Sequence, residues 1–117
     1  MTVGHSADTR LIAYGTLAPG EVNEHQLADL AGRWLTGTVR GHRVSGNWYG
    51  DRTLPGFILG ADEPPVDIHV FESHDLPAHW ARLDAFEGPN YRRTIATVTL
   101  SDGSRIDGQI YEFIGEV

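Results

Sequence analysis

The stretch RTIATVTLSDGSRIDGQIYEFI, which spans residues 93–114, decides the fold class of this chain. Its two arms, 93–100 and 105–114, are rich in the β-branched and aromatic residues that favour strands. The turn between them, 101–104, contains an Asp-Gly pair, and Asp-Gly between two such arms is the strongest short-range signal for a β-hairpin. The sequence therefore predicts that its final two strands pair in the antiparallel sense.

Four segments upstream of this hairpin also favour strands. Residues 11–17 are mostly apolar and bounded by polar residues, as a short buried strand would be. Residues 34–45 combine Thr and Val with two glycines, which is typical of a long, bent strand. Residues 57–59 and 68–71 are shorter candidates. Strands are therefore expected to outnumber helices.

Two short helices are expected beside the strands. The first would begin after Asn23, which can cap a helix with Gln26 as its capping-box partner, and would end near Gly32. The second would have Pro77 in its first turn and end at Gly88. Their apolar positions at helical spacing are Leu27, Leu30, Ala31 and Trp34 in the first, and Leu76, Trp80, Leu83 and Phe86 in the second. Together these elements predict an α+β domain on a mixed, mostly antiparallel sheet that could close into a small barrel.

Composition and charge exclude several classes of function. The 117 residues are enough for one domain, 1–117, and 40% hydrophobic residues can form its core. Nine arginines, no lysines and sixteen carboxylates give a net charge of −7, which repels nucleic acid and acidic membranes. The lack of lysine excludes Schiff-base and P-loop chemistry, and the lack of cysteine excludes disulfides, thiolate metal sites and a cysteine nucleophile.

Features of export and membrane insertion are also missing from the sequence. No apolar run approaches the roughly 18 residues that a spanning helix needs. Residues 1–10 have neither a basic start nor an apolar stretch, so no export signal is expected. These features predict a cytoplasmic protein that acts on a small molecule, with no nucleic-acid or membrane partner. The sequence leaves the oligomeric state open.

Glu87 occupies a position in the second predicted helix where an apolar residue is expected. It lies seven residues after Trp80 and four after Leu83, on the same helical face. Burial there and the partial negative charge of the helix C-terminus both raise the pKa of a carboxyl, which suits a general base near neutral pH. The alternative is a frayed last turn in which Glu87 reaches water. Asp84 lies off this face and is expected to be an ordinary solvated acid.

A second candidate site is the segment 14–17, in which Gly15 follows an apolar strand. A glycine here allows a ligand to approach the backbone, and the following amide N–H groups can bind a carboxylate or a developing oxyanion. Tyr14 and Thr16, two residues apart, would present hydroxyls on one face. The alternative is that Gly15 marks a β-bulge without a binding role.

These two segments resemble the motifs of a known family. Residues 14–17, YGTL, resemble the YGSL-type loop of the γ-glutamylcyclotransferase-like family, which includes the AIG2-like proteins. Residues 83–88, LDAFEG, followed by Tyr91 and Arg93, resemble its LDxxEG…YxR segment. Further segments that resemble the family, in the expected order, are 46–49, 54–56 and 108–111. The resemblance covers residues 10–114, with two departures: threonine replaces serine in the loop, and residues 67–71 lack the family's Gly-Glu pair.

The resemblance implies a small mixed β-barrel flanked by helices. It also implies an enzyme that cyclises a γ-glutamyl group to 5-oxoproline and releases the attached amine, without a metal or cofactor. By resemblance, Glu87 is the catalytic general acid and base, and Tyr91 lines the same cavity. The substrate-binding residues that it implies are Tyr14, Gly15, Thr16 and Leu17. A non-catalytic module that binds a small ligand is the alternative, and the leaving group stays open among glutathione, γ-glutamyl amino acids, γ-glutamyl amines and carrier-bound units.

Other candidate residues have weaker support. His69, His74 and His79 are spaced by five, which fits neither one helical face nor alternate positions of a strand, so no zinc site is expected. Arg92 and Arg93 could each bind a substrate carboxylate or pair with a surface acid. The remaining candidates are aromatic: Trp48 and Tyr49, in a predicted loop over 47–56, could form a pocket wall, whereas Trp34 and Trp80 are expected in the core.

Overall fold

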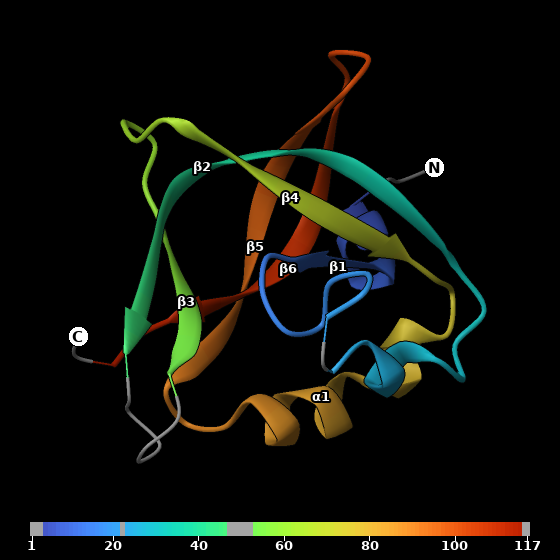
Figure 1. Ribbon diagram of the computed structural model, residues 1–117. Helices are drawn as coiled ribbons and strands as arrows, with labels where there is room; N and C mark the ends of the chain where they lie inside the picture. The colour runs from blue at the N-terminus through green and yellow to red at the C-terminus, as the bar shows by residue number, and fades with distance from the viewer. Residues whose placement is uncertain (1–3, 22, 47–52, 116–117) are drawn as a thin grey trace.

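The structure, a computed structural model, describes residues 4–21, 23–46 and 53–115. Trp48 and Tyr49 therefore lie outside the described residues. Within these ranges the chain forms six strands, one α-helix and three 3₁₀ turns, labelled η (Figure 1). In chain order they are η1 (Gly4–Thr9), β1 (Arg10–Ala13), η2 (Glu24–Leu27), β2 (Arg33–Gly46), β3 (Leu54–Leu59), β4 (Pro65–Glu72), η3 (Leu76–Ala78), α1 (Trp80–Glu87), β5 (Tyr91–Leu100) and β6 (Arg105–Phe113). No helix among the described residues has the length and apolar composition needed to cross a membrane.

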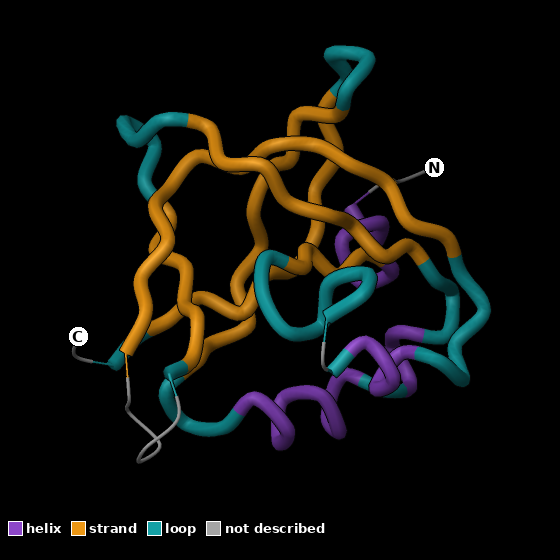
Figure 2. Tube along the Cα trace, in the orientation of Figure 1, coloured by secondary structure: helices purple, strands orange, loops and turns teal. Residues whose placement is uncertain are grey.

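Five of the strands close into a barrel. The sheet order is β3-β2-β4-β1-β6-β5, and an additional pairing of β2 with β5 completes the ring, with β3 attached to β2 as an extra strand. Figure 2 shows the strands surrounding a common interior, with α1, η2 and η3 gathered at one end and η1 apart from them. Among the described strands, β1 and β6 pair in parallel and every other pair is antiparallel. The predicted α+β fold with a mixed, mostly antiparallel barrel is confirmed.

The β5–β6 hairpin that the sequence predicted is present. Its strands pair from Tyr91↔Phe113 to Thr99↔Arg105. In the turn, Gly103 adopts a φ of 89°, a left-handed conformation that glycine adopts without strain. The Asp102 carboxylate accepts the Ser104 amide N–H at 2.9 Å and the Ser104 hydroxyl at 2.6 Å. The turn is therefore specified by local chemistry, which is why its sequence predicted it.

The first predicted helix is wrong. Only the 3₁₀ turn Glu24–Leu27 forms, and the Asn23 side chain makes no capping hydrogen bond. Leu27 and Leu30 are buried as expected, but their burial is achieved by an irregular turn. The chain then enters β2 beside β4, where a Cβ on Gly32 would lie 2.4 Å from the Glu72 carbonyl oxygen. Packing of the chain against the barrel therefore overrides the local helix pattern.

Part of the predicted 47–56 loop is also strand. Leu54, Pro55 and Gly56 begin β3 and pair with Gly46, Ser45 and Val44 of β2, respectively. Proline is tolerated because β3 pairs with β2 alone among the described strands and so lies at the edge of the sheet. The strand predicted over 11–17 is shorter than expected, since β1 ends at Ala13 and residues 14–17 leave the sheet in a turn. The other predicted strands form, and β2 is the long strand expected over 34–45.

The second predicted helix forms as α1. It follows η3, which carries Pro77 in its first turn, and it ends at Gly88, whose φ of 89° is left-handed. Trp80 and Leu83 are buried, each contributing about 1.5–3 kcal/mol of hydrophobic stabilisation. Phe86, predicted to belong to the same apolar stripe, is 40% exposed. The helix therefore packs against the core through Trp80 and Leu83, and its C-terminal turn is more exposed.

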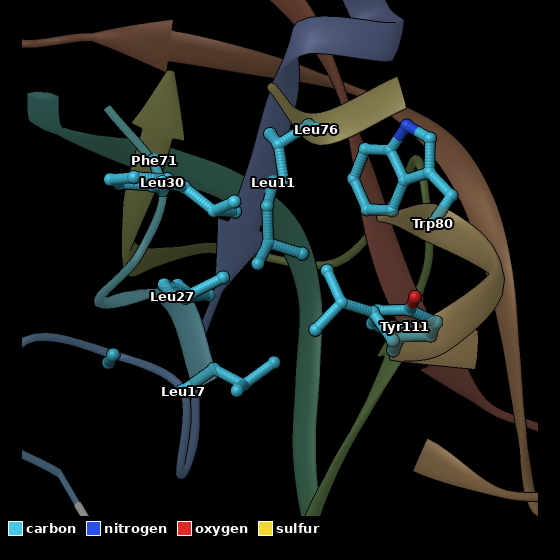
Figure 3. Packing of buried hydrophobic residues seen from close by; sticks show 11 residues of the cluster. Leu11, Leu17, Leu27, Leu30, Phe71, Leu76, Trp80 and Tyr111 are labelled. Atoms are coloured by element: carbon cyan, nitrogen blue, oxygen red, sulfur yellow. The ribbon is translucent and has the colours of Figure 1, made fainter. Parts of the chain in front are cut away.

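Two clusters of buried residues form the core, one on each face of β1. Leu11 belongs to the first and Ile12 to the second, because alternate residues of a strand point to opposite faces. The first cluster lies between the barrel and its helical end (Figure 3) and consists of Leu11, Ala13, Leu17, Ala18, Leu27, Leu30, Phe71, Leu76, Trp80, Leu83 and Tyr111. The second comes from all six strands and consists of Ile12, Val39, Phe57, Ile68, Val70, Ala96, Val98 and Ile110. The first cluster holds α1 against the segment after β1, and this contact positions the candidate site.

Candidate active site

A cavity of about 240 Å³ lies where the segment after β1 meets the C-terminal turn of α1. Residues of β1, β3, β5 and β6, and Asn23 before η2, also contribute to its wall. The lining residues are Leu11, Ile12, Ala13, Tyr14, Gly15, Thr16, Leu17, Asn23, Leu54, Pro55, Phe86, Glu87, Tyr91 and Tyr111. All six predicted site residues, namely Tyr14, Gly15, Thr16, Leu17, Glu87 and Tyr91, therefore line a single cavity.

Glu87 is the last residue of α1 and contributes a half-buried carboxyl to this cavity. The last turn is closed by a hydrogen bond from the Gly88 amide to the Asp84 carbonyl oxygen at 3.1 Å. Burial raises the pKa of Glu87 to about 7, because the carboxylate loses hydration. At neutral pH this carboxyl is therefore present in both protonation states, which is the condition for taking up and giving back a proton.

The segment 14–17 forms a tight turn beside Glu87. The Gly15 carbonyl accepts the Ala18 amide at 3.0 Å, and the Thr16 carbonyl accepts the Asn23 amide at 2.8 Å. The amide N–H groups of Gly15, Thr16 and Leu17 donate to no acceptor in the part of the chain that the structure describes. Because Leu17 is buried, the turn is held against the core while its donors stay available to a ligand.

Gly15 is required by close packing. Its φ is not left-handed, but a Cβ at this position would lie 2.7 Å from Cγ of Pro55. The segment before it is positioned by Arg43 of β2, which donates to the Tyr14 carbonyl at 2.6 Å and to the Asp67 carbonyl at 2.7 Å. The glycine therefore lets β3 and the turn approach each other at the cavity.

Two tyrosine hydroxyls of the cavity wall are used in structural hydrogen bonds. Tyr14 donates to the Tyr111 carbonyl at 2.7 Å, and Tyr91 donates to the Pro55 carbonyl at 2.7 Å. Burial, followed by the negative charge of Glu87, raises the pKa of Tyr14 well above its ordinary value. The Tyr14 phenol therefore stays protonated, and the two hydrogen bonds link the segment after β1 to β6 and β5 to β3 around the cavity.

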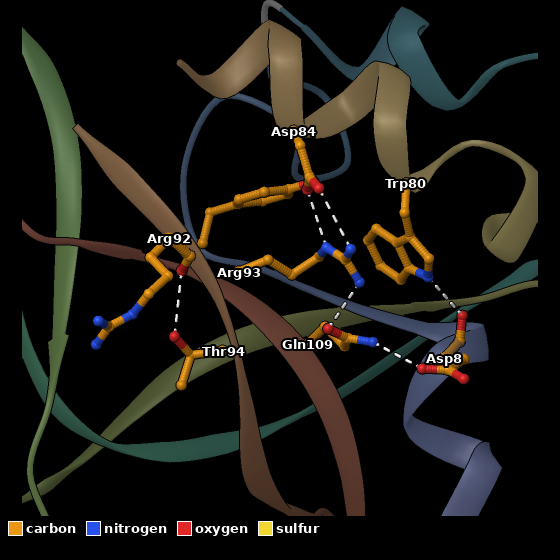
Figure 4. Close-up of polar contacts among 8 residues, drawn as sticks. Asp8, Trp80, Asp84, Arg92, Arg93, Thr94 and Gln109 are labelled. Atoms are coloured by element: carbon orange, nitrogen blue, oxygen red, sulfur yellow. Dashed lines mark hydrogen bonds and ion pairs between the residues drawn. The ribbon is translucent and has the colours of Figure 1, made fainter. Parts of the chain in front are cut away.

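Asp84 is partly solvated, as its helical position predicted, with 43% of its side chain exposed, but it is also paired with neighbouring strands. Its carboxylate accepts Arg93 Nε at 2.9 Å, Arg93 Nη2 at 3.2 Å and the Tyr111 hydroxyl at 2.7 Å. Figure 4 shows this group continuing from Arg93 to Gln109 and on to Asp8. Burial alone would raise the pKa of Asp84, but the bonds from Arg93 and Tyr111 outweigh it and lower the pKa. Spacing along α1 could not reveal these contacts because the partners lie on β5 and β6.

Several cavity residues were not found from the sequence. Tyr111 is the most informative, since β6 lies beside β1 at the cavity through a parallel pairing of segments far apart in the chain. No local pattern predicts that pairing. The remaining lining residues that the sequence did not indicate are Leu11, Ile12, Ala13, Asn23, Leu54, Pro55 and Phe86.

The three histidines considered for zinc do not form a metal site. His69 packs edge-on against Trp34 with ring centroids 6.3 Å apart, and His79 accepts Arg82 Nε at 3.3 Å. Among the described residues, no group of three His, Asp or Glu side chains is arranged to hold a metal ion. Arg92, for its part, lies 3.7 Å from Glu112.

The fold and the cavity together define a small barrel protein with one ionisable carboxyl of raised pKa in the wall of its cavity. Glu87 and the turn at residues 14–17 line this cavity together with Tyr91 and Tyr111. The family model for gamma-glutamyl cyclotransferase, AIG2-like proteins matches residues 11–116, so the chain belongs to this family. No curated protein sequence matches the chain.

Solved structures show the same fold. An AIG2-like protein from Mus musculus superimposes with a TM-score of 0.72 at 19% identity, covering 93% of this chain and 79% of that one. YkqA from Bacillus subtilis gives a TM-score of 0.65 at 25% identity, covering 90% of this chain and 35% of that one. An uncharacterized protein from Pyrococcus horikoshii gives 0.62 at 18% identity, covering 92% and 80%. The barrel is therefore shared with proteins from a mammal, a bacterium and an archaeon.

Proposed function

We propose that this protein is a γ-glutamyl cyclotransferase that converts a γ-glutamyl amine or γ-glutamyl peptide to 5-oxoproline and the free amine. The observation that supports this function best is the Glu87 carboxyl, which has a pKa raised to about 7 by burial. It lines the same cavity as the residues whose amides can act as donors, 14–17. Membership of the gamma-glutamyl cyclotransferase, AIG2-like family supports the reaction class. Glu87 serves as general base and then as general acid.

The reaction is an intramolecular displacement. The Glu87 carboxylate takes a proton from the α-ammonium group of the γ-glutamyl unit, and the free amine attacks the γ-carbonyl carbon. A C–N bond forms and closes a five-membered ring, leaving an oxyanion on the tetrahedral carbon. Protonated Glu87 donates to the leaving nitrogen as the old C–N bond breaks. The ring nitrogen then gives its extra proton to the Glu87 carboxylate, and Glu87 passes this proton to the released amine. Glu87 ends the reaction as a carboxylate, as it began.

Positioning and electrostatic stabilisation are the remaining tasks of the cavity. Ring closure brings its own high effective molarity, so the protein need only hold the reactive conformer. The amide N–H groups of Gly15, Thr16 and Leu17 are the donors for the oxyanion or the substrate carboxylate. A cavity of about 240 Å³ suits a small ligand such as one γ-glutamyl unit, and its wall includes Phe86, which is 40% exposed.

Release of 5-oxoproline tests this function. Wild type and Glu87→Gln are incubated with glutathione, γ-glutamyl dipeptides and γ-glutamyl amines, and the product is quantified by mass spectrometry. Wild type should release 5-oxoproline from at least one compound, and Glu87→Gln should lose about 10²–10⁴-fold in kcat because it removes the general base. Glu63→Gln, in the turn before β4, is the matched control and should retain wild-type activity.

The alternative of a binding module is distinguished by the same proteins. If wild type binds a γ-glutamyl compound in calorimetry but releases no 5-oxoproline from any of them, the enzyme is excluded in favour of a binding protein. If Glu87→Gln turns over as fast as wild type, Glu87 is not the acid–base group.

A further inference from the structure

The helix that carries Glu87 is short and ends at that residue. α1 has eight residues, and the ends of such helices fray unless side chains hold them. Leu83 is fully buried at its centre, but Phe86, next to Glu87, is exposed. A general base at this position therefore needs a contact that fixes the final turn.

Asp84, three residues before Glu87, makes that contact. One carboxylate oxygen, Oδ1, accepts both Arg93 Nε of β5 and the Tyr111 hydroxyl of β6. The other oxygen accepts Arg93 Nη2, so that the Arg93–Asp84 pair is a two-point contact of fixed geometry. A single side chain thus links the last turns of α1 to both strands of the hairpin.

The partners of Asp84 are themselves held in place. Arg93 Cζ lies 4.6 Å from the centre of the Trp80 ring, and Arg93 Nη1 donates to the Gln109 side-chain oxygen at 2.9 Å. Tyr111 lines the cavity and accepts the Tyr14 hydroxyl through its carbonyl oxygen. A displacement of Asp84 would therefore change the positions of Tyr111 and Tyr14 in the cavity wall as well as the position of Glu87.

We propose that Asp84 is a positioning residue for Glu87, which fixes the last turn of α1 through Arg93 and Tyr111 and pairs the Arg93 charge away from the Glu87 carboxyl. This inference rests on the proposed cyclotransferase function. Asp84 acts through Arg93 and Tyr111 and is not itself a lining residue of the cavity.

The electrostatic part follows from the charges around this corner. Glu87 and Arg93 both act on the Tyr111 phenol, raising and lowering its pKa respectively, and Asp84 also raises it, so all three charges lie near this side chain of β6. The groups that act in the same way on Tyr14, after β1, are Glu87, Tyr91 of β5, Arg43 of β2 and Glu112 of β6. Without the Asp84 charge, the Arg93 guanidinium is no longer neutralised, and it favours the ionised form of Glu87. The pKa of Glu87 would then fall.

Substitution Asp84→Asn tests both parts. Asparagine keeps an oxygen for Tyr111 and Arg93 Nε but points an amide donor at Arg93 Nη2, which breaks the two-point contact. We expect kcat to fall about 10- to 100-fold with KM nearly unchanged, as a misplaced catalytic group requires. The acid limb of the kcat/KM profile should move to lower pH. Asp62→Asn, at an exposed position in the turn before β4, removes the same charge and should match wild type in both respects.

Tyr111→Phe is the second variant, since it removes one donor to Asp84 and leaves every charge in place. It should lower kcat about 3- to 10-fold without moving the acid limb. Thermal unfolding of each variant establishes that it is folded. If Asp84→Asn does not fold, wild-type kcat in Tyr111→Phe overturns the positioning role.

NMR titration of the Glu87 carboxyl carbon provides a readout independent of turnover. Its pKa should be lower in Asp84→Asn than in wild type and unchanged in Asp62→Asn and Tyr111→Phe. Wild-type kcat in Asp84→Asn overturns the positioning role, and a wild-type Glu87 titration overturns the electrostatic role. Should wild type release no 5-oxoproline at all, the proposed function fails, and the titration still decides whether Asp84 controls Glu87.

Discussion

At the scale of the residue, the half-buried Glu87 carboxyl gives the proposed reaction its pH dependence. The base form of Glu87 is the carboxylate, and burial raises its pKa to about 7. We therefore expect kcat/KM to rise with pH through an acid limb whose midpoint lies near pH 7. Initial rates of 5-oxoproline release between pH 5 and 9 measure it. A midpoint near 4.5, the ordinary value for a glutamate, would show that Glu87 is solvated in the working enzyme.

The same burial predicts a pH-dependent gain of stability in Glu87→Gln. The folded pKa of about 7 lies above the ordinary value of 4.5, so the protonated carboxyl stabilises the fold below pH 4.5 and this stability is lost as the pH rises to 7. Glutamine stays neutral and avoids that loss. We expect Glu87→Gln to be more stable than wild type by about 1–3 kcal/mol at pH 8 and equal to it at pH 4. Urea unfolding at both pH values measures this, with Glu63→Gln as the control. A difference in stability between Glu87→Gln and wild type that did not depend on pH would contradict the prediction.

At the scale of the element, Arg43 connects β2 to the turn that contains the proposed substrate-binding amides. Its two hydrogen bonds, to the carbonyls of Tyr14 and Asp67, fix the peptide that precedes Gly15. We expect Arg43→Gln to lower kcat/KM about 3- to 10-fold by loosening this turn. Arg40→Gln is the matched control, because Arg40 donates to the Glu63 carbonyl in the turn before β4. Equal kinetics for the two variants would mean that the turn does not depend on Arg43.

Elements whose signals are local could be predicted from the sequence. The hairpin turn is specified by Asp102 and Gly103, and the end of α1 by Gly88. The helix expected after Asn23 was wrong because its buried leucines are held by neighbouring elements rather than by helical hydrogen bonds. Barrel closure also depends on distant pairings, and no local pattern indicates which strand meets which.

The candidate site, like the fold, could be predicted where its signals are local. Glu87 stood out as a charge on an apolar helical face, and the turn at 14–17 as a glycine at the end of a strand, and both line the cavity. Asp84 and Tyr111 lie in segments that carried the resemblance, but their contact was not predicted, since it is a hydrogen bond between α1 and β6. Such a bond between distant segments leaves no periodic signal in either of them.

At the scale of the whole molecule, the barrel closes at a narrow contact between β2 and β5. Only Gly37↔Leu100 and Thr38↔Thr99 pair there among the described residues. A Cβ on Gly37 would lie 2.6 Å from the Thr99 carbonyl oxygen, which is backbone and cannot move aside cheaply. We expect Gly37→Ala to destabilise the fold by about 2 kcal/mol or more. Thermal or urea unfolding measures this, with Gly60→Ala, which meets only the Glu63 side chain, as the control. A wild-type Tm for Gly37→Ala would show that this contact contributes little to stability.

The parallel pairing of β1 with β6 has a consequence for how the protein is made. A ribosome delivers β1 and the 14–17 turn early, but their neighbour β6 follows only after every other strand described. Until then Tyr14 lacks the carbonyl of Tyr111, and α1 lacks the tyrosine that contacts Asp84. A nascent chain that already carries Glu87 is therefore unable to assemble the cavity. The cavity can therefore be completed only after residues 105–113 have emerged, and folding depends on contacts between segments far apart in the chain.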